Sequence, residues 1–234
     1  MAADVIDYRI EGDHAPLLTV TLDPGEAVQA EAGAMVMMDQ DIKMTTELSG
    51  GLLGGLFRKF SGESLFLTYF VNEGDERQDV SFAGSMPGQI RAMDLSENGG
   101  LFYCQRDAYL CSARGVDVSI ALTRKLGAGF FGGEGLILQK LEGDGLAFLN
   151  AGGTLVEREL AAGQRITVDT GCLVGFSGTC DYDIAFQKGI RNLVFGGEGI
   201  FVTHVTGPGR VIVQTQPIAE LAMSLARLMP KEGD

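Results

Sequence analysis

Three glutamates that recur in one glycine-rich motif are the residues whose type and spacing could most readily do chemistry. Glu134 and Glu198 each stand in a Gly-Gly-Glu-Gly motif, and Glu63 stands in the related Ser-Gly-Glu-Ser. Carboxylates that converge repel one another, so together they would bind a hard cation or hold a proton with a raised pKa. Each glutamate could instead accept hydrogen bonds from the N–H groups of its own turn. We favour this local role over a metal cluster of Glu63, Glu134 and Glu198.

The Gly-Gly-Glu-Gly motif also suggests a phosphate-binding loop, but its surroundings do not fit one. Neither copy is followed by the Lys-Ser/Thr pair of a P-loop. Each copy precedes an apolar run typical of a strand rather than a helix, Leu136–Leu138 and Ile200–Val202. The same features argue against a dinucleotide-binding loop. The motif therefore predicts tight turns, and we expect no bound cofactor.

The histidines and cysteines show no catalytic or metal-binding pattern. His14 lies in a predicted turn and His204 in a predicted strand, and no Ser or Cys stands in a recognised nucleophile motif. The four cysteines are spaced more widely than the pairs of most zinc sites: Cys104, Cys111, Cys172 and Cys180. We expect an exposed His14, a His204 on a sheet face, and cysteines that act as small buried hydrophobes in a reducing compartment. No catalytic residue is predicted.

A short apolar segment with two cations could contact a membrane or a partner. Arg58 and Lys59 are flanked by five large apolar residues, Leu52, Leu53, Leu56, Phe57 and Phe60. On a membrane, such side chains enter the lipid while the cations face the headgroups. On soluble monomers exposed patches of this size are rare, so the segment could equally plug one end of a β-core or contact another subunit. We favour the covered role and keep the membrane contact as the alternative.

The charge of the chain argues against nucleic acid as a partner. The net charge is −13 over 234 residues. The densest basic clusters are only Arg58-Lys59 and Arg124-Lys125, whereas a nucleic-acid binder needs a basic patch to neutralise phosphates. Asp4 and Asp7 stand where a signal peptide would be basic and then apolar, and no apolar run approaches the length of a membrane span. We therefore expect a cytoplasmic protein.

Glycine usage and apolar patterning predict an all-β fold. The 34 glycines are about twice the ordinary share, and many tight turns between short strands would require them. One such turn is Asp23-Pro24-Gly25-Glu26, in which proline presets φ and glycine follows. The tail differs: Pro217 precedes Ile218, Leu221, Leu225 and Leu228, which form one helical stripe. We predict a C-terminal helix over 217–229.

The chain carries an internal threefold repeat. Leu22, Leu95 and Leu160 occupy equivalent places. Each is followed by one of the three motif glutamates at a similar distance along the chain. The copies are offset by about 65 to 75 residues, and each holds apolar runs joined by short glycine turns. We predict a single compact domain over 1–234, built of small antiparallel repeats at about 1–86, 87–153 and 154–216. The three repeats are expected to pack around a pseudo-threefold core.

Several motifs in their order and spacing resemble the altered inheritance of mitochondria protein 24 family. These motifs are Pro24-Gly25-Glu26, Glu31-x-Gly33-Ala34-Met35-Val36, Gly62-Glu63-Ser64, Met86-Pro87-Gly88, the run Gly100–Leu110 and both Gly-Gly-Glu-Gly copies. The resemblance implies three tandem double-stranded β-helix units, with a fold like that of the tryptophan RNA-binding attenuation protein, whose subunits form rings. The family's eukaryotic member is tied to mitochondrial inner-membrane organisation, and its bacterial members have no established activity. No catalytic residue carries over, and neither does RNA binding, because the chain is acidic.

Two classes of function remain open. The first is a non-enzymatic scaffold or interaction protein that self-associates, because a repeat architecture offers β-edges that a homo-oligomer can cover. Its protein partners other than itself cannot be named from the sequence. The alternative is a small-ligand binder or enzyme with a pocket between the repeat units. A deep pocket where polar residues of different units converge would distinguish the second class from the first.

Overall fold

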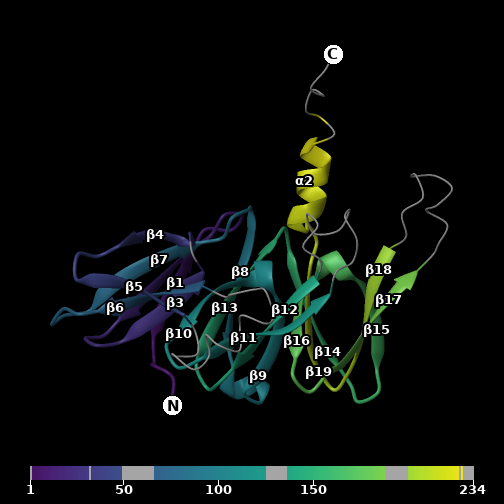
Figure 1. Ribbon diagram of the computed structural model, residues 1–234, viewed down its shortest axis with the longest axis horizontal. Helices are drawn as coiled ribbons and strands as arrows, with labels where there is room; N and C mark the ends of the chain where they lie inside the picture. Colours follow the sequence, from purple (N-terminus) through teal and green to yellow (C-terminus); the bar gives the residue numbers. More distant parts are fainter. Residues whose placement is uncertain are drawn as a thin grey trace.

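Strands form along most of the chain that the structure describes. The computed structural model (Figure 1) describes residues 2–31, 33–48, 66–124, 136–187, 200–226 and 228. Over these residues the fold is all-β with one C-terminal α-helix, which confirms the predicted class. Glu63, Glu134, Glu198 and the apolar segment from Leu52 to Phe60 lie outside the described residues, so what was predicted for them stays a prediction.

The described strands fall into three successive sets of six, preceded by one N-terminal strand, β1 (Asp7–Glu11). The first set is β2 (Leu17–Leu22), β3 (Ala27–Glu31), β4 (Met35–Met38), β5 (Ile42–Leu48), β6 (Phe66–Asn72) and β7 (Gln78–Ala83). The second set is β8 (Gly88–Asp94), β9 (Leu101–Gln105), β10 (Tyr109–Ala113), β11 (Asp117–Arg124), β12 (Leu136–Glu142) and β13 (Leu146–Gly152).

The third set repeats this series. It consists of β14 (Leu155–Leu160), β15 (Arg165–Asp169), β16 (Leu173–Ser177), β17 (Asp181–Gln187), β18 (Ile200–Thr206) and β19 (Gly209–Gln214). Within the described residues, short 3-10 helices interrupt the strands at η1 (Ser96–Asn98), η2 (Arg106–Ala108) and η4 (Thr170–Cys172). The strands β12 and β18 begin directly after the two Gly-Gly-Glu-Gly motifs, as their apolar runs predict, and β6 begins two residues after Ser64.

The turn at Asp23-Pro24-Gly25-Glu26 shows how the turn residues set the hairpins. Gly25 has a φ of 86°, which the third position of a type II turn requires and which side chains with a Cβ rarely adopt. The backbone N–H of Glu26 donates to the carbonyl oxygen of Asp23 at 3.0 Å. The predicted turn is therefore confirmed, and it delivers the chain from β2 to β3.

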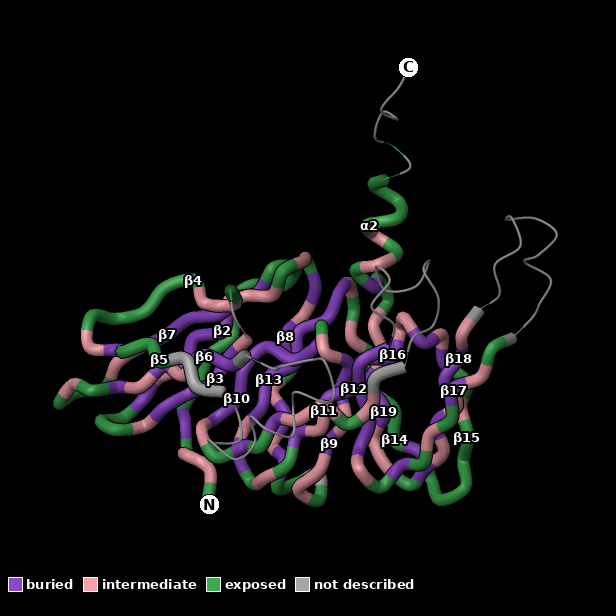
Figure 2. The backbone as a smooth tube through the Cα atoms, viewed as in Figure 1, coloured by how far each residue is buried: buried purple, intermediate pink, exposed green. Residues whose placement is uncertain are grey.

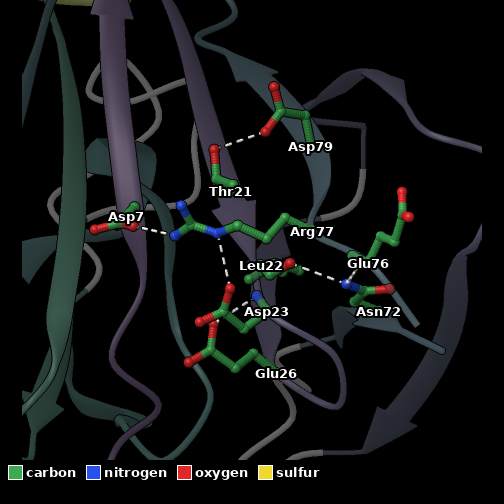
Figure 3. Close-up of polar contacts among 9 residues, drawn as sticks. All are labelled: Asp7, Thr21, Leu22, Asp23, Glu26, Asn72, Glu76, Arg77 and Asp79. Atoms are coloured by element: carbon green, nitrogen blue, oxygen red, sulfur yellow. Dashed lines mark hydrogen bonds and ion pairs between the residues drawn. The ribbon is translucent and has the colours of Figure 1, made fainter. Parts of the chain in front are cut away.

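Side chains from distant segments fix this turn to its neighbours (Figure 3). The amide Nδ2 of Asn72, at the end of β6, donates to the carbonyl oxygen of Leu22 at 2.9 Å. The guanidinium of Arg77 lies between Asp7 and Asp23, and its Nε is 2.7 Å from the Asp23 carboxylate. The N-terminal strand β1 is thereby linked to the end of the first strand set.

The strands pair into four antiparallel sheets. Sheet A has the order β1-β2-β7-β4, and sheet D has the order β15-β18-β17. Sheets B and C have six strands each, in the orders β5-β6-β3-β10-β13-β8 and β11-β12-β9-β16-β19-β14. Sheets B and C therefore each join three strands of one set to three strands of the next.

Three hydrophobic cores separate the four sheets. Between sheets A and B, Leu18 and Phe82 pack with Phe70 and Phe148. A second core lies between sheets B and C, and a third between sheets C and D. The order A, B, C, D along the long axis can be followed in Figure 1, and the buried residues between the sheets in Figure 2.

The predicted packing around a pseudo-threefold core is not confirmed. The first and third strand sets lie at opposite ends of the molecule, with the second set between them (Figure 1). No pairing joins the described strands of the first set to those of the third. The reason is topological. In each junction one strand of a set pairs with one strand of the next set, so the three sets form a row whose two ends are not joined to each other.

The C-terminal helix α2 (Ile218–Ala226) follows Pro217, as predicted. The N–H of Leu221 donates to the carbonyl oxygen of Pro217 at 3.2 Å, which places the first helical turn at the proline. None of its residues is buried, and the helix projects away from the sheets (Figures 1 and 2). None of the described helices has the length and apolar character that a membrane span requires.

Candidate functional site at two open sheet edges

Two junctions inside the chain show how its sheets are extended. In sheet B, β10 pairs with β3 and places Cys111 opposite Ala30. In sheet C, β16 pairs with β9 and places Gly175 opposite Cys104. Both junctions continue beyond the strand ends through one further backbone hydrogen bond, from Arg114 N to the oxygen of Ala27 at 3.0 Å and from Gly178 N to that of Leu101 at 2.9 Å.

Side chains reinforce the first junction from both strands. The Gln29 amide Nε2 donates to the Ser112 hydroxyl at 3.0 Å and to the carbonyl oxygen of Val116 at 2.6 Å. The Tyr109 hydroxyl donates to the carbonyl oxygen of Gln29 at 3.2 Å. Every residue of β10 is buried, and so is every residue of β16 at the second junction. Pairing on both sides therefore places these two strands fully inside the protein.

One open edge is β4, which pairs with β7 alone among the described strands. Its sequence is Met-Val-Met-Met, and the exposed fractions are 54% for Val36, 54% for Met37 and 38% for Met38 (Figure 2). An apolar strand with unpaired N–H and C=O groups along one side is a template for another strand. β4 is thus the exposed counterpart of the buried β10 and β16.

A second open edge is β15, which pairs with β18 alone among the strands that the structure describes; the described edge strands β1, β5, β8, β11, β14 and β17 likewise pair with one strand each. β15 alternates, with Arg165 and Thr167 exposed and Val168 buried in the third core. The edges β4 and β15 lie at opposite ends of the molecule (Figure 1). Each strand has one side along which no described strand pairs with it.

A carboxyl group in the first junction, that of Glu31, has a raised pKa. The pKa of Glu31, the last residue of β3, is raised from 4.5 to about 7, chiefly by burial and also by the nearby Asp107, while Arg106 opposes the rise. At the second junction the equivalent residue is Gln105, whose amide donates to the carbonyl oxygen of Thr170 at 2.5 Å. The first junction therefore contains a titratable group where the second contains a neutral amide.

The predicted histidines take the places expected of them. His14 is exposed in a turn, and His204 lies on the outer face of sheet D. The register puts His204 opposite both Thr167 and Asp183, and its Nδ1 is 2.8 Å from the Thr167 hydroxyl. This Thr-His-Asp row is one that sequence spacing did not reveal, because it depends on cross-strand pairing. It lies on an open sheet face and lines neither described cavity, so it lacks the enclosed pocket of a nucleophilic site.

The cysteines are free thiols placed mostly in the core. Cys104, Cys111 and Cys180 are buried and Cys172 is half-buried, so the predicted burial is confirmed for three of the four. Burial raises the pKa of Cys172 to about 11 and that of Cys104 further still. Such thiols stay protonated and are poor nucleophiles. Within the described part of the chain, no three His, Cys, Asp or Glu residues gather as metal ligands would.

The cavities between strand sets are limited in size or depth. One cavity of about 30 Å³ at the base of α2 is lined by Gln105, Asp107, Asn150 and Gln214, and the Asn150 Oδ1 there is buried without a hydrogen-bond partner. This volume holds one or two water molecules. A wider groove of about 410 Å³ is lined by residues that include Arg91 and is open to solvent. Neither has the enclosed apolar shape of a small-ligand site.

Comparison with known proteins places the chain in a family. The sequence profile of the family described as Mitochondrial biogenesis AIM24 matches residues 8–216. The chain belongs to this family. It is 30% identical over 227 residues to an uncharacterized protein of Streptococcus pyogenes serotype M6, covering 94% of this chain and 89% of that protein. The family resemblance that the sequence motifs indicate is thus confirmed.

A solved structure has the same fold. The X-ray crystal structure of a protein from Streptococcus pyogenes superimposes with a TM-score of 0.77 and 26% sequence identity. The match covers 96% of this chain and all of the other. The arrangement of four stacked sheets is therefore shared with a family relative, and neither similar protein carries a stated activity.

Proposed function

We propose that this protein is a non-enzymatic interaction protein, a scaffold that self-associates through the open edges of its sheets. The observation that carries the proposal is β4, a four-residue apolar edge strand with three residues exposed to water. The strands in the same position of the second and third sets, β10 and β16, are buried throughout. Self-association buries β4, as β10 and β16 are already buried within the chain.

The physical driving force is the apolar surface of β4 together with its free backbone groups. Burying a Val or Met side chain completely contributes about 1.5 to 3 kcal/mol, and those of β4 are already partly covered, so each adds on the order of 1 kcal/mol. Backbone hydrogen bonds to a second strand add about 1 kcal/mol each when formed in a protected sheet. Several such terms together offset the lost translational and rotational freedom that association costs, and they favour the pairing of β4.

Two further observations support an interaction role over an enzymatic one. His204 and its cross-strand neighbours lie on an open sheet face, where water competes with any substrate. The cavity between the second and third strand sets is too small for a substrate. We further infer that the three sets of strands are copies of one unit of the double-stranded β-helix type, with boundaries near 86 and 153. A scaffold of repeated units needs no catalytic group.

Light scattering on the purified full-length chain at micromolar concentration tests the proposal. We expect a mass well above that of one chain, and a shift toward the monomer in Met37→Asp, because a charge on β4 opposes burial. The matched control is Val156→Asp, which places the same charge on β14, at a valine that is 42% exposed. A strict monomer, or an equal effect of both variants, contradicts self-association through β4.

A further inference from the structure

Sheets D and A contain strands that correspond to the two halves of sheet B or sheet C. Reading outward, sheet B has the order β5-β6-β3 and then β10-β13-β8, with a junction between β3 and β10. Sheet D read in the same direction is β17-β18-β15, and sheet A is β4-β7-β2, followed by β1. Joining β15 to β4 gives β17-β18-β15-β4-β7-β2, which is the order found in sheets B and C. This deduction rests on the proposed self-association and specifies its partner.

The strand positions in sequence make the correspondence quantitative. β9 and β10 begin 74 residues after β3 and β4, and β15 and β16 begin 64 residues after β9 and β10. Each offset applies equally to the two strands of a set that take part in junctions. The missing junction must therefore have β15 in the place of β3 and β9, and β4 in the place of β10 and β16.

An irregularity in the sheets checks this alignment independently. The pairing of β10 with β13 shifts register between Tyr109 and Cys111, and that of β16 with β19 shifts between Leu173 and Gly175. The pairing of β4 with β7 shifts between Met35 and Met37, which are 74 residues before the first pair. The three strands thus have the same local bend at the same position, and a bulge of this kind fixes which residues face the next strand. β4 is therefore already shaped to accept a strand as β10 and β16 do.

We propose that β15 of one copy of this protein pairs antiparallel with β4 of the next copy, with Val168 opposite Met37 and Thr167 opposite Met38. The register follows from the two internal junctions by the same offsets. It also places Gln40 where Arg114 and Gly178 stand, so the N–H of Gln40 donates to the carbonyl oxygen of Arg165 in the other copy. The side chain of Arg165 then comes beside Asp39 and Asp41, so the charges of the two edges are complementary.

The symmetry of such an assembly follows from the chemistry of its edges. The contact joins two different surfaces, so an open array keeps one free β4 at one end and one free β15 at the other until it closes. The products are a closed ring or a growing row, and a dimer that pairs β4 with β4 or β15 with β15 is excluded. In either product the stack of sheets continues without interruption from one chain to the next, and β1 stays on the far side of β2.

Cysteine cross-linking between copies tests the register directly. Met38 and Thr167 are the chosen pair, because the equivalent side chains touch in both internal junctions, Gln29 with Ser112 and Tyr103 with Phe176. Thr167 is exposed on the outer face of sheet D, and Met38, which stands opposite the buried Val80, is 38% exposed at the open edge, so either substitution should leave most of the core intact. The variants Met38→Cys and Thr167→Cys are purified separately, mixed and treated with the oxidant diamide. The two thiols lose two protons and two electrons to form the disulfide, and diamide is reduced to the hydrazine.

The expected result is a covalent dimer in the mixture, in about tenfold excess over either variant alone, because a disulfide requires its two Cα atoms within about 7 Å. The unmodified chain, treated in the same way, controls for the native cysteines. The mixture of Met38→Cys with Arg165→Cys is the out-of-register control, and it should cross-link no better than the single variants. The double variant Met38→Cys/Thr167→Cys should give a ladder of species or one closed ring.

The possible failures separate the register from the proposed function. Light scattering is measured on the same variants before oxidation. If they are oligomers but the mixture does not cross-link, or if Met38→Cys cross-links by itself, the head-to-tail pairing is wrong and self-association stands. If Arg165→Cys links as well as Thr167→Cys, the register is wrong. If the variants and the unmodified chain are all strict monomers, both proposals are overturned.

Discussion

Replacing Glu31 by glutamine should remove a pH-dependent loss of stability. Burial raises the Glu31 pKa from 4.5 to about 7, so in the folded protein the carboxyl group keeps its proton to near neutrality. The unfolded chain ionises near the ordinary value. A carboxyl group with a raised folded pKa destabilises the fold as pH increases from the unfolded value to the folded value, and beyond that the loss is constant.

The magnitude follows from the size of the shift. One pKa unit corresponds to about 1.4 kcal/mol, so the free energy of unfolding should decrease by about 3 kcal/mol between pH 4.5 and pH 7.5 through this group. Glu31→Gln has nearly the same shape and carries no ionisable proton. Its amide would stand where Gln105 stands in the second junction, donating a hydrogen bond to a backbone carbonyl oxygen. The free energy of unfolding of the variant should therefore increase relative to that of the unmodified chain as pH rises.

Urea unfolding at several pH values between 4.5 and 8.5 measures the effect. The quantity of interest is the difference in free energy of unfolding between Glu31→Gln and the unmodified chain, because other carboxyl groups titrate equally in both. Glu76→Gln, at an exposed position, is the control for the loss of a glutamate charge at the surface. A difference for Glu31→Gln that is independent of pH would refute the reasoning from burial.

Two other substitutions test the packing and the turn. Phe82→Ala removes a fully buried ring that contacts Phe70 edge-on at a centroid distance of 5.2 Å, so the free energy of unfolding should decrease by about 3 to 5 kcal/mol in guanidinium titrations. Gly25→Ala meets no atom within 4 Å but must adopt a φ of 86°, so we expect a loss of about 1 kcal/mol in the same assay. Gly25→Asn, which tolerates positive φ better, should lose less, and equal losses would contradict the assignment of the cost to the positive φ.

Local structure was largely readable from the sequence, because it depends on neighbours along the chain. The turn at Asp23-Pro24-Gly25-Glu26 contains the residues that its backbone angles require, and the helix after Pro217 carries its apolar stripe. The threefold spacing of the motifs predicted strands at 136 and 200, where β12 and β18 begin. Each of these signals acts over a few residues, and each was confirmed.

The candidate site was not readable in the same way, because an edge is a property of a sheet and not of a strand. Met35–Met38 reads as an apolar strand no different from Leu173–Ser177, yet one is exposed and the other is buried. The row of Thr167, His204 and Asp183 likewise exists only through the register of three strands. No spacing along the chain could have brought these residues together.

The sequence by itself determined the family, the all-β class, the repeated order of strands and the positions of the turns. It did so because turn geometry, apolar alternation and motif spacing are short-range properties. Only the tertiary structure decided that the three sets of strands lie in a row and that β4 and β15 end it unpaired. The physical reason is that each sheet takes half its strands from the next set, so the first and last sets must each leave one half-sheet open.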